Sequence, residues 1–185
     1  MLNLDKINIS ADFLNRITKN FEPEIAIILG SGWGDFADEF NGQSVKYSDI
    51  PNFEVSKVQG HKGQLLFAEI FGKKVVIMQG RFHFYEGHSI SQTVFPIAVL
   101  KKMGIEKIII TNAAGGANPT FQAGDLMMIT DQIACFAPNP LIGPNVEELG
   151  TRFPDMTDLY TPAIQDIIGL IQVVLKCVIP VTLII

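Results

Sequence analysis

The chain alternates between runs of apolar residues and amphipathic stretches, and short polar loops separate them. The apolar runs are short, rich in β-branched residues and bounded by glycine or polar residues, which is typical of buried strands. The predicted strands are Ile25–Leu29, Gln64–Ile70, Val75–Gln79, Lys107–Thr111 and Leu126–Thr130. The turn sequence Phe71-Gly-Lys-Lys separates the second strand from the third, so these two form a predicted hairpin.

A 3.6-residue period predicts a short amphipathic helix over Ser10–Asn20. Ser10 is its predicted N-cap, because a serine hydroxyl can accept a hydrogen bond from a free amide of the first turn. One face of this helix carries the apolar side chains Phe13, Leu14 and Ile17.

A second helix is predicted over Ser89–Met103. Ser89 and Gln92 have the spacing of a capping box, and Gly104 has the character of a helix stop. Pro96 lacks an amide hydrogen, so it predicts either a kink within this helix or a later start.

Helices and strands alternate, and the strands are continuously apolar. Both features favour an α/β fold class, a single domain with a mixed, largely covered sheet flanked by helices. No repeat or low-complexity linker divides the 185 residues, which are enough for one compact domain.

Composition narrows the possible partners. An apolar fraction of 48% beside a charged fraction of 18% excludes a disordered chain. The net charge of −5 argues against a nucleic-acid surface but leaves room for a small anion in a locally positive pocket. Cys135 and Cys177 lack CxxC spacing, which predicts free thiols in a reducing compartment. The N-terminus lacks the apolar run of a signal peptide, so we expect a cytoplasmic protein.

Three glycine-bearing loops follow predicted strands. Gly30-Ser-Gly-Trp-Gly34 offers successive amides and the Ser31 hydroxyl to an anion, although its spacing matches neither a dinucleotide-binding fingerprint nor a Walker A loop. Thr111–Pro119 consists mainly of small residues, which leave room for a flat ligand and expose backbone amides. A tight turn without a function is the alternative for each loop taken alone. Together they favour a ligand site, since ligands collect where strands end in open α/β sheets.

The remaining loop, Gln79–Gly87, contains the most side chains that could bind a ligand or transfer a proton. Arg81 supplies a charged fork suited to bidentate phosphate binding, and His83 titrates near neutral pH. If the backbone is extended here, Arg81, His83 and Tyr85 share one face, while Phe82 and Phe84 pack on the other. The alternative is a solvated strand end with an ion pair between Arg81 and Glu86.

These segments resemble the purine nucleoside phosphorylases of the trimeric, low-molecular-mass class. The resemblance runs from about Glu24 to Tyr160, and its most specific parts are RFHFYEG and TNAAGGANP. The matching stretches are ILGSGWG (28–34), VQGHKGQL (58–65), MQGRFHFYEGH (78–88), TNAAGGANPTFQAGDLMMITDQI (111–133), NPLIGPN (139–145) and RFPDMTDLY (152–160).

The resemblance implies a single α/β domain around a mixed, distorted, barrel-like sheet, and a homotrimer with active sites near subunit interfaces. It implies phosphorolysis of a purine (deoxy)nucleoside, which yields the free purine and (deoxy)ribose 1-phosphate. Inorganic phosphate is then a co-substrate, and neither a metal nor an organic cofactor is expected, nor a nucleic-acid or membrane partner.

It also implies a role for each site residue. Arg81 and His83 are the expected catalytic residues. The phosphate contacts are expected from Ser31, His61, Arg81, Phe82, His83 and the Ala113 amide. Tyr85 would contact the ribose, Phe153 would reach a neighbouring subunit's ribose pocket, and Ala114 and Gly115 would line the base site. Taken alone, His61 between its two glycines could equally be an ordinary exposed histidine of a loop.

The chain departs from the family after Tyr160, where the purine-gripping GP-x-x-E-T-P-like stretch of the family is not found. Residues 1–166 are therefore expected to form a partial phosphorylase domain, and residues 167–185 an atypical apolar tail. An altered reading frame or a truncation near Asp166 is one hypothesis, and a native tail that docks as a buried helix or strand is the other. Lys176, Gln172 and Pro180 disfavour a membrane span.

Two further functions stay open from the sequence. One is a catalytically inactive phosphate-binding fragment or interaction partner. The other is a methylthioadenosine phosphorylase, against which the RFHFYEG segment argues.

Overall fold

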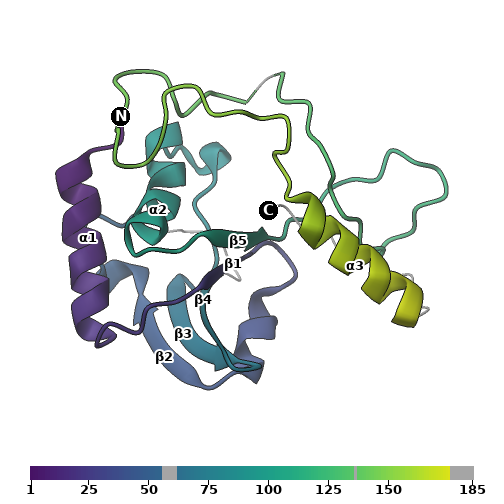
Figure 1. The fold of residues 1–185 in the computed structure, drawn as a ribbon, viewed down its shortest axis with the longest axis horizontal. Coiled ribbons are helices and arrows are strands. Elements are labelled where there is room, and N and C mark those ends of the chain that lie inside the picture. The colour runs from purple at the N-terminus through teal and green to yellow at the C-terminus, as the bar shows by residue number, and fades with distance from the viewer. Residues whose placement is uncertain (56–61, 136, 176–185) are drawn as a thin grey trace.

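The computed structural model describes residues 1–55, 62–135 and 137–175 (Figure 1). One mixed sheet forms its centre, with two long helices on one face and short 3₁₀ helices around it. The elements are α1 (Leu4–Ile17), β1 (Ile25–Leu29), η1 (Gly34–Glu39), β2 (Gly42–Lys46), η2 (Tyr47–Asp49), β3 (Gln64–Ile70), β4 (Lys73–Gln79), η3 (Phe84–Glu86), α2 (Ile90–Lys102), β5 (Lys107–Ile110) and α3 (Pro162–Leu175).

The five strands lie in the order β2-β3-β4-β1-β5. β1 is parallel to both β4 and β5, whereas β2, β3 and β4 form an antiparallel meander. This arrangement confirms the predicted mixed α/β domain, the strand Ile25–Leu29 and the hairpin. In the hairpin turn, Phe71 and Gly72 both have positive φ angles, 49° and 75°, as a tight two-residue connection requires.

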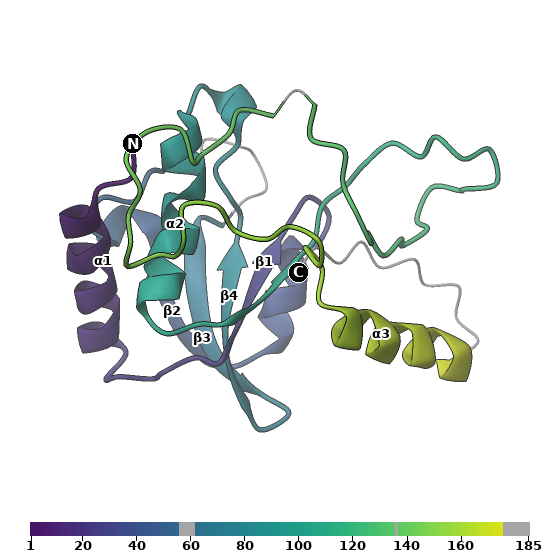
Figure 2. The same cartoon turned by 45° about the horizontal axis from the view of Figure 1, so that its top comes forward.

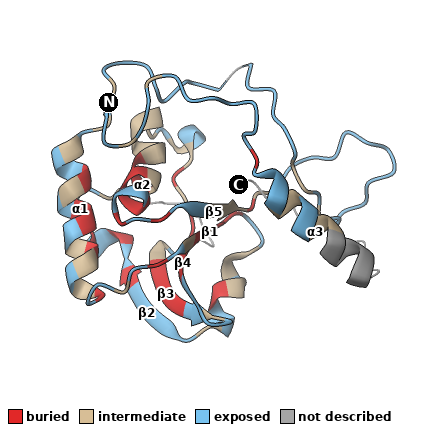
Figure 3. Ribbon diagram, in the orientation of Figure 1, coloured by how far each residue is buried: buried red, intermediate tan, exposed pale blue. Residues whose placement is uncertain are grey.

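The main core lies between one face of the sheet and the helices α1 and α2 (Figure 3). The smaller core on the opposite face is built from Leu66, Ala68, Val75 and Ile77 of the sheet and from the aromatic side chains beside η1. The sheet is therefore covered on both faces, which explains why its strands are continuously apolar.

The first helix begins earlier than the sequence predicts. Its N-cap is Asn3, whose side-chain oxygen accepts the Lys6 amide at 2.9 Å. Ser10 as the N-cap is wrong: Ser10 is fully buried within α1, and its hydroxyl lies 2.6 Å from the Pro51 carbonyl oxygen and 2.9 Å from that of Lys6. Asn3 has the same capping chemistry, and buried Ile7 extends the apolar face by two turns.

The second helix agrees with its predicted signals. Ser89 and Gln92 form the capping box, and Gly104 follows the C-cap with a φ of +92°. The helix begins at Ile90 and continues through Pro96, so the alternative of a late start is wrong.

Leu126–Thr130 is not a strand, and this prediction is wrong. The described residues of the segment between β5 and α3 contain no helix or strand, and most are exposed (Figures 2 and 3). A strand needs a hydrogen-bonded neighbour, and among the described residues Leu126–Thr130 pairs with none. The apolar run alone could not reveal this.

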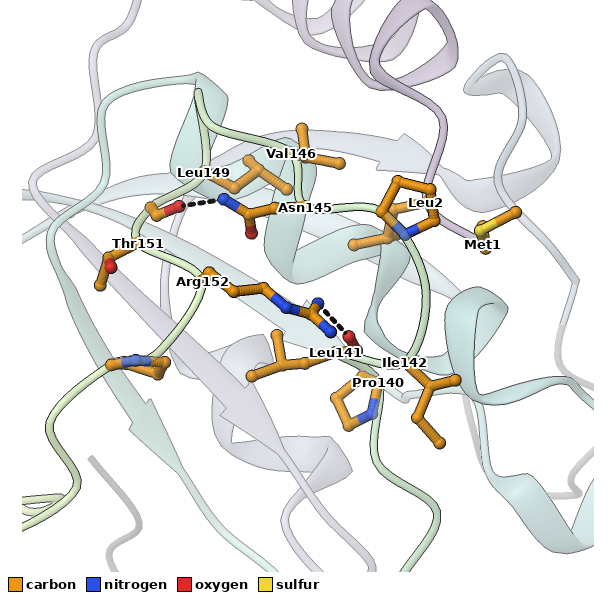
Figure 4. A pocket seen from close by; sticks show the side chains of 13 residues that line it. Met1, Leu2, Pro140, Leu141, Ile142, Asn145, Val146, Leu149, Thr151 and Arg152 are labelled. Atoms are coloured by element: carbon orange, nitrogen blue, oxygen red, sulfur yellow. Dashed lines mark hydrogen bonds between the residues drawn. The ribbon is translucent and has the colours of Figure 1, made fainter.

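Part of this long segment returns to the N-terminus (Figure 4). Met1 and Leu2 line a cavity of about 300 Å³ together with residues from Pro140 to Pro154. Two hydrogen bonds hold the loop around it: the Asn145 side chain donates to the Gly150 carbonyl at 3.1 Å, and the Arg152 guanidinium donates to the Leu141 carbonyl.

Tyr47 connects the end of β2 to the end of β4. Its ring is buried against Phe53 and Phe82, with ring centroids 5.7 and 5.4 Å away. Its hydroxyl donates to the Gly80 carbonyl at 2.6 Å, and burial raises the pKa of this phenol well above its ordinary value of 10.0. Tyr47 therefore supports the backbone immediately before Arg81.

Replacing Tyr47 by phenylalanine leaves the buried Gly80 carbonyl without its donor. We expect the free energy of unfolding to fall by about 1–3 kcal/mol at neutral pH. Because the folded-state pKa is raised, the folded chain holds this proton where the unfolded chain releases it, so wild-type stability falls as the pH rises above 10.0. Denaturant titrations between pH 7 and 11 measure both effects. Tyr85→Phe, at a phenol that is 75% exposed, is the control; equal alkaline slopes for wild type and Tyr47→Phe would contradict the prediction.

Candidate functional site

Three loops meet at one edge of the sheet because β4, β1 and β5 are parallel. The register pairs Leu29 with Gln79 and Ile28 with Ile110. The chain therefore leaves all three strands at the same level, at Gly30, Gly80 and Thr111. The predicted convergence of the three glycine-bearing loops follows from this register.

The loops after β1 and β5 are joined directly. The Gly30 amide donates to the Thr111 hydroxyl at 2.9 Å, and the Thr111 amide donates to the Ile28 carbonyl at 2.9 Å. A Cβ at position 30 would lie 2.4 Å from the Thr111 carbonyl oxygen, a distance that only glycine avoids. Position 30 thus needs a glycine because two backbones approach closely there.

A cavity of about 520 Å³ opens between these two loops. Ser31 and Trp33 line it from one side, and residues 112–118 line it from the other. The structure thus brings four of the predicted site residues to one cavity, and these are Ser31, Ala113, Ala114 and Gly115. The small side chains leave room for a flat ligand, as the sequence predicts.

The loop after β4 presents a cation at the same edge. Phe82 is buried against Tyr47 and Phe53, so the flanking Arg81 and His83 extend from the other side of the backbone. Arg81 Nε is buried and has no hydrogen-bond partner among the described residues. Burial lowers the pKa of the Arg81 guanidinium from its ordinary value, but arginine stays protonated at neutral pH. A buried cationic donor of this kind suits an anion.

Beyond His83 the predicted extended backbone gives way to η3. Phe84 is 56% exposed, so its predicted packing beside Phe82 is wrong. The Glu86 carboxylate accepts the His83 amide at 3.0 Å and closes a tight turn, which rotates Phe84 outward. The His83 and Tyr85 rings remain neighbours and stack with centroids 4.6 Å apart.

Other predicted site residues lie apart from the cavity. Tyr85 is 75% and Phe153 84% exposed, and within the described part of the chain neither lines the 520 Å³ cavity, nor do Arg81 and His83. His61 falls outside the described residues.

Sequence reasoning missed two polar residues that shape the site. Thr111 and Gln79 each end an apolar run and are buried, with 5% and 1% of their surfaces exposed. The signal was present in the sequence, because a polar residue in a core-facing position must find hydrogen-bond partners.

Residues 1–55, 62–135 and 137–175 contain no group of three or more histidine, cysteine or acidic side chains that could hold a metal ion. None of their helices is long and apolar enough to cross a membrane.

Comparison with known proteins identifies the family. A sequence profile described as "Phosphorylase superfamily" matches residues 24–170. The chain belongs to the phosphorylase superfamily. The match covers all five strands and the three loops at the sheet edge.

Individual members of the superfamily are also similar. Purine nucleoside phosphorylase 1 of Geobacillus stearothermophilus is 53% identical over 147 residues, which are 78% of this chain and 53% of that protein. Purine nucleoside phosphorylase 1 of Bacillus subtilis is 52% identical over 157 residues, 84% of this chain and 58% of that protein. The chain thus spans slightly more than half the length of these relatives.

A solved structure of the superfamily has the same fold. Isoform 2 of the Schistosoma mansoni purine nucleoside phosphorylase, in complex with cytosine and ribose-1-phosphate, superimposes with a TM-score of 0.87 at 36% identity. The superposition covers 97% of this chain and 64% of that one.

The close approach at Gly30 is testable by substitution. Gly30→Ala places a methyl group against the Thr111 backbone, so the two loops must separate, and we expect a loss of about 1–3 kcal/mol of stability. Gly115→Ala is the matched control, because nothing lies within 4 Å of a Cβ at that position. Urea denaturation measures both variants. A wild-type midpoint for Gly30→Ala would contradict the close approach.

Proposed function

We propose that this chain is part of an enzyme that cleaves purine nucleosides by phosphorolysis and releases the free purine and ribose 1-phosphate. One observation carries the proposal: three glycine-bearing loops converge at one sheet edge, where Arg81 offers a buried donor. The similar proteins named purine nucleoside phosphorylase support it, as does the ribose-1-phosphate named with the Schistosoma mansoni structure.

In this proposal, phosphate is the nucleophile and binds at the convergence of the loops. Arg81 and His83 approach it from the end of β4, Ser31 from the end of β1, and the Ala113 amide from the end of β5. Phe82 contributes backbone to the clamp, and His61 closes over the anion. A rigid arrangement of donors around a desolvated anion is the usual source of strong electrostatic stabilisation in an active site.

The reaction would pass through a ribosyl cation-like transition state as the bond from C1′ to the purine nitrogen breaks. Phosphate must lie in line with that bond, and its negative charge stabilises the sugar cation. The clamp therefore has to position phosphate without cancelling its charge, a task suited to amides, a hydroxyl and one guanidinium. Phosphate is a co-substrate here, and no cofactor takes part.

Ala114 and Gly115, which line the 520 Å³ cavity, are the proposed base site. Tyr85 and Phe153 are the proposed ribose contacts, Phe153 toward the pocket of a neighbouring subunit. Both side chains are largely exposed, which supports a homotrimer in which subunits complete each other's sites. A cytoplasmic location and the division into a domain of residues 1–166 and a tail of residues 167–185 stay predictions.

A second candidate is phosphate binding without turnover. The side-chain chemistry gathered at the sheet edge is that of an anion site, whereas the base region contributes mainly small residues. Incubation with inosine and phosphate, followed by detection of hypoxanthine, separates the two candidates. Methylthioadenosine in place of inosine tests the sister phosphorylase activity.

Arg81 is the side chain whose loss should matter most. We expect Arg81→Ala to lower kcat/KM for phosphorolysis by about 10²–10³, the effect of removing one preorganised donor. Arg81→Lys should recover only part of it, because a lysine cannot form a planar bidentate contact. Arg16→Ala, on the exposed face of α1, is the matched control. Phosphate-dependent hypoxanthine release measures all three, and full activity of Arg81→Ala would refute the assigned role.

A further inference from the structure

Gln79 is a polar residue at a position of β4 where the two-residue alternation of side chains predicts an apolar, core-facing residue. Val75 and Ile77 precede it at two-residue intervals on β4, and both belong to the smaller core on the η1 face of the sheet. Gln79 is the next residue of that row and is 1% exposed. Its partner across the β3–β4 ladder is Gln64, so two amides face each other at the end of an otherwise apolar layer.

The Gln79 amide is hydrogen-bonded on both sides. Its oxygen accepts from the Gln64 side chain at 2.6 Å. Its nitrogen donates to the Gly34 carbonyl at 3.0 Å and lies 3.3 Å from an Asp38 carboxylate oxygen. The donors point to η1, and the acceptor points back to β3. This polarity fixes the orientation of the amide.

One of the two bonds of the nitrogen, the bond to Gly34, reaches the loop that the proposed function places on phosphate. Gly34 is the last residue of the Gly30–Gly34 loop and the first of η1. Beneath the loop lies a small cavity of about 30 Å³, lined by Gly30, Ser31, Gly32, Gly34 and Gln79 among others. The Gln79 side chain therefore contacts the glycine-rich loop from beneath, by its hydrogen bond to the Gly34 carbonyl and as part of the lining of this cavity.

A loop with three glycines in five residues has little conformational preference of its own. One end is fixed by the Gly30 amide, which donates to Thr111, and the other end needs an equivalent anchor. The Gln79 bond to Gly34 supplies it. Asp38 is held in turn by an ion pair with Lys62, which keeps the carboxylate beside the amide nitrogen and lowers the Asp38 pKa.

We propose that Gln79 is a positioning residue for phosphate binding, which fixes the far end of the Gly30–Gly34 loop and so aims the Ser31 hydroxyl and the loop amides. The proposal rests on the proposed function for its ligand, but the positioning of the loop has a readout of its own. Gln79 itself stays beneath the loop and acts through Gly34.

Two substitutions distinguish positioning from packing. Gln79→Met keeps the length of the side chain and removes its hydrogen bonds to Gln64, Gly34 and Asp38. Gln79→Glu keeps the shape but replaces the donating nitrogen by an oxygen, which then faces the Gly34 carbonyl and the Asp38 carboxylate. A packing role predicts that both variants are mild, whereas positioning predicts that both loosen the loop and that Gln79→Glu is the worse. Gln43→Met, at an exposed position of β2, is the matched control.

Trp33, the one tryptophan of the chain, lies within the loop and reports its state. The experiment measures Trp33 emission and its quenching by acrylamide, and the Kd of inorganic phosphate by calorimetry, on the full chain. For Gln79→Met we expect a red shift, stronger quenching and a Kd raised about tenfold, the effect of losing the one hydrogen bond that anchors the loop at Gly34. If the chain turns over inosine, KM for phosphate should rise while KM for inosine stays unchanged.

The outcomes separate the positioning role of Gln79 from the proposed phosphate-binding function. Unchanged Trp33 emission and phosphate Kd in Gln79→Met overturn the positioning role. If wild type binds no phosphate, the proposed function fails, and the Trp33 readout alone still tests the positioning of the loop. If Gln79→Met does not fold, Gln64→Met tests the same point more gently, because it removes only the bond that orients the Gln79 amide; a wild-type Trp33 signal in that variant also overturns the role.

Discussion

The backbone contact between Gly30 and Thr111 determines the geometry of the candidate site. β1 lies between β4 and β5, so the loop that leaves it must pass the end of β5 at close range. Only a residue without a side chain can do so, and the Thr111 hydroxyl then accepts the Gly30 amide. Ser31 and Ala113 face one cavity as a consequence of this contact.

Several buried polar groups lie at this same edge of the sheet, although the rest of the core is mainly apolar. Tyr47 supports Gly80, Gln79 supports Gly34, and Arg81 brings a partly desolvated cation. Burying such groups costs free energy unless each is hydrogen-bonded, and two of the three are. The third, Arg81, keeps a buried donor that no described residue satisfies, and an anion could satisfy it. The support network therefore fixes the loops, and under the proposed function the remaining donor is the one that phosphate satisfies.

Local sequence patterns predicted the parts of the fold that depend on local interactions. β1, the β3–β4 hairpin and the capped helix α2 follow from apolar runs, turn residues and a capping box. Ser10 was misassigned because its hydroxyl is satisfied partly by Pro51, which is distant in sequence. Leu126–Thr130 was misassigned because strand formation depends on a neighbour that an apolar run does not reveal.

The candidate site follows the same rule: its residues are predictable where local sequence decides their position, and unpredictable where a turn or a buried contact decides it. Residues that directly follow the parallel strands could be placed together once the strands were recognised, as Ser31 and Ala113 were. Phe84 could not, because the short turn closed by Glu86 overrides the two-residue alternation. Gln79 and Thr111 escape the sequence prediction because a polar residue at a strand end is typical of the start of a loop, although both side chains are buried.

The described residues divide the site into two parts of different character. The proposed anion-binding part is made of strand ends whose backbone is fixed by the sheet register, by glycine contacts and by buried side chains. The proposed sugar contacts, Tyr85 and Phe153, come instead from an exposed turn and an exposed segment. Under the proposed function, a single chain would orient phosphate through its own core, whereas closing the ribose pocket would require a surface that packs against those two side chains. Under the same proposal, subunit assembly would affect nucleoside binding more than phosphate binding.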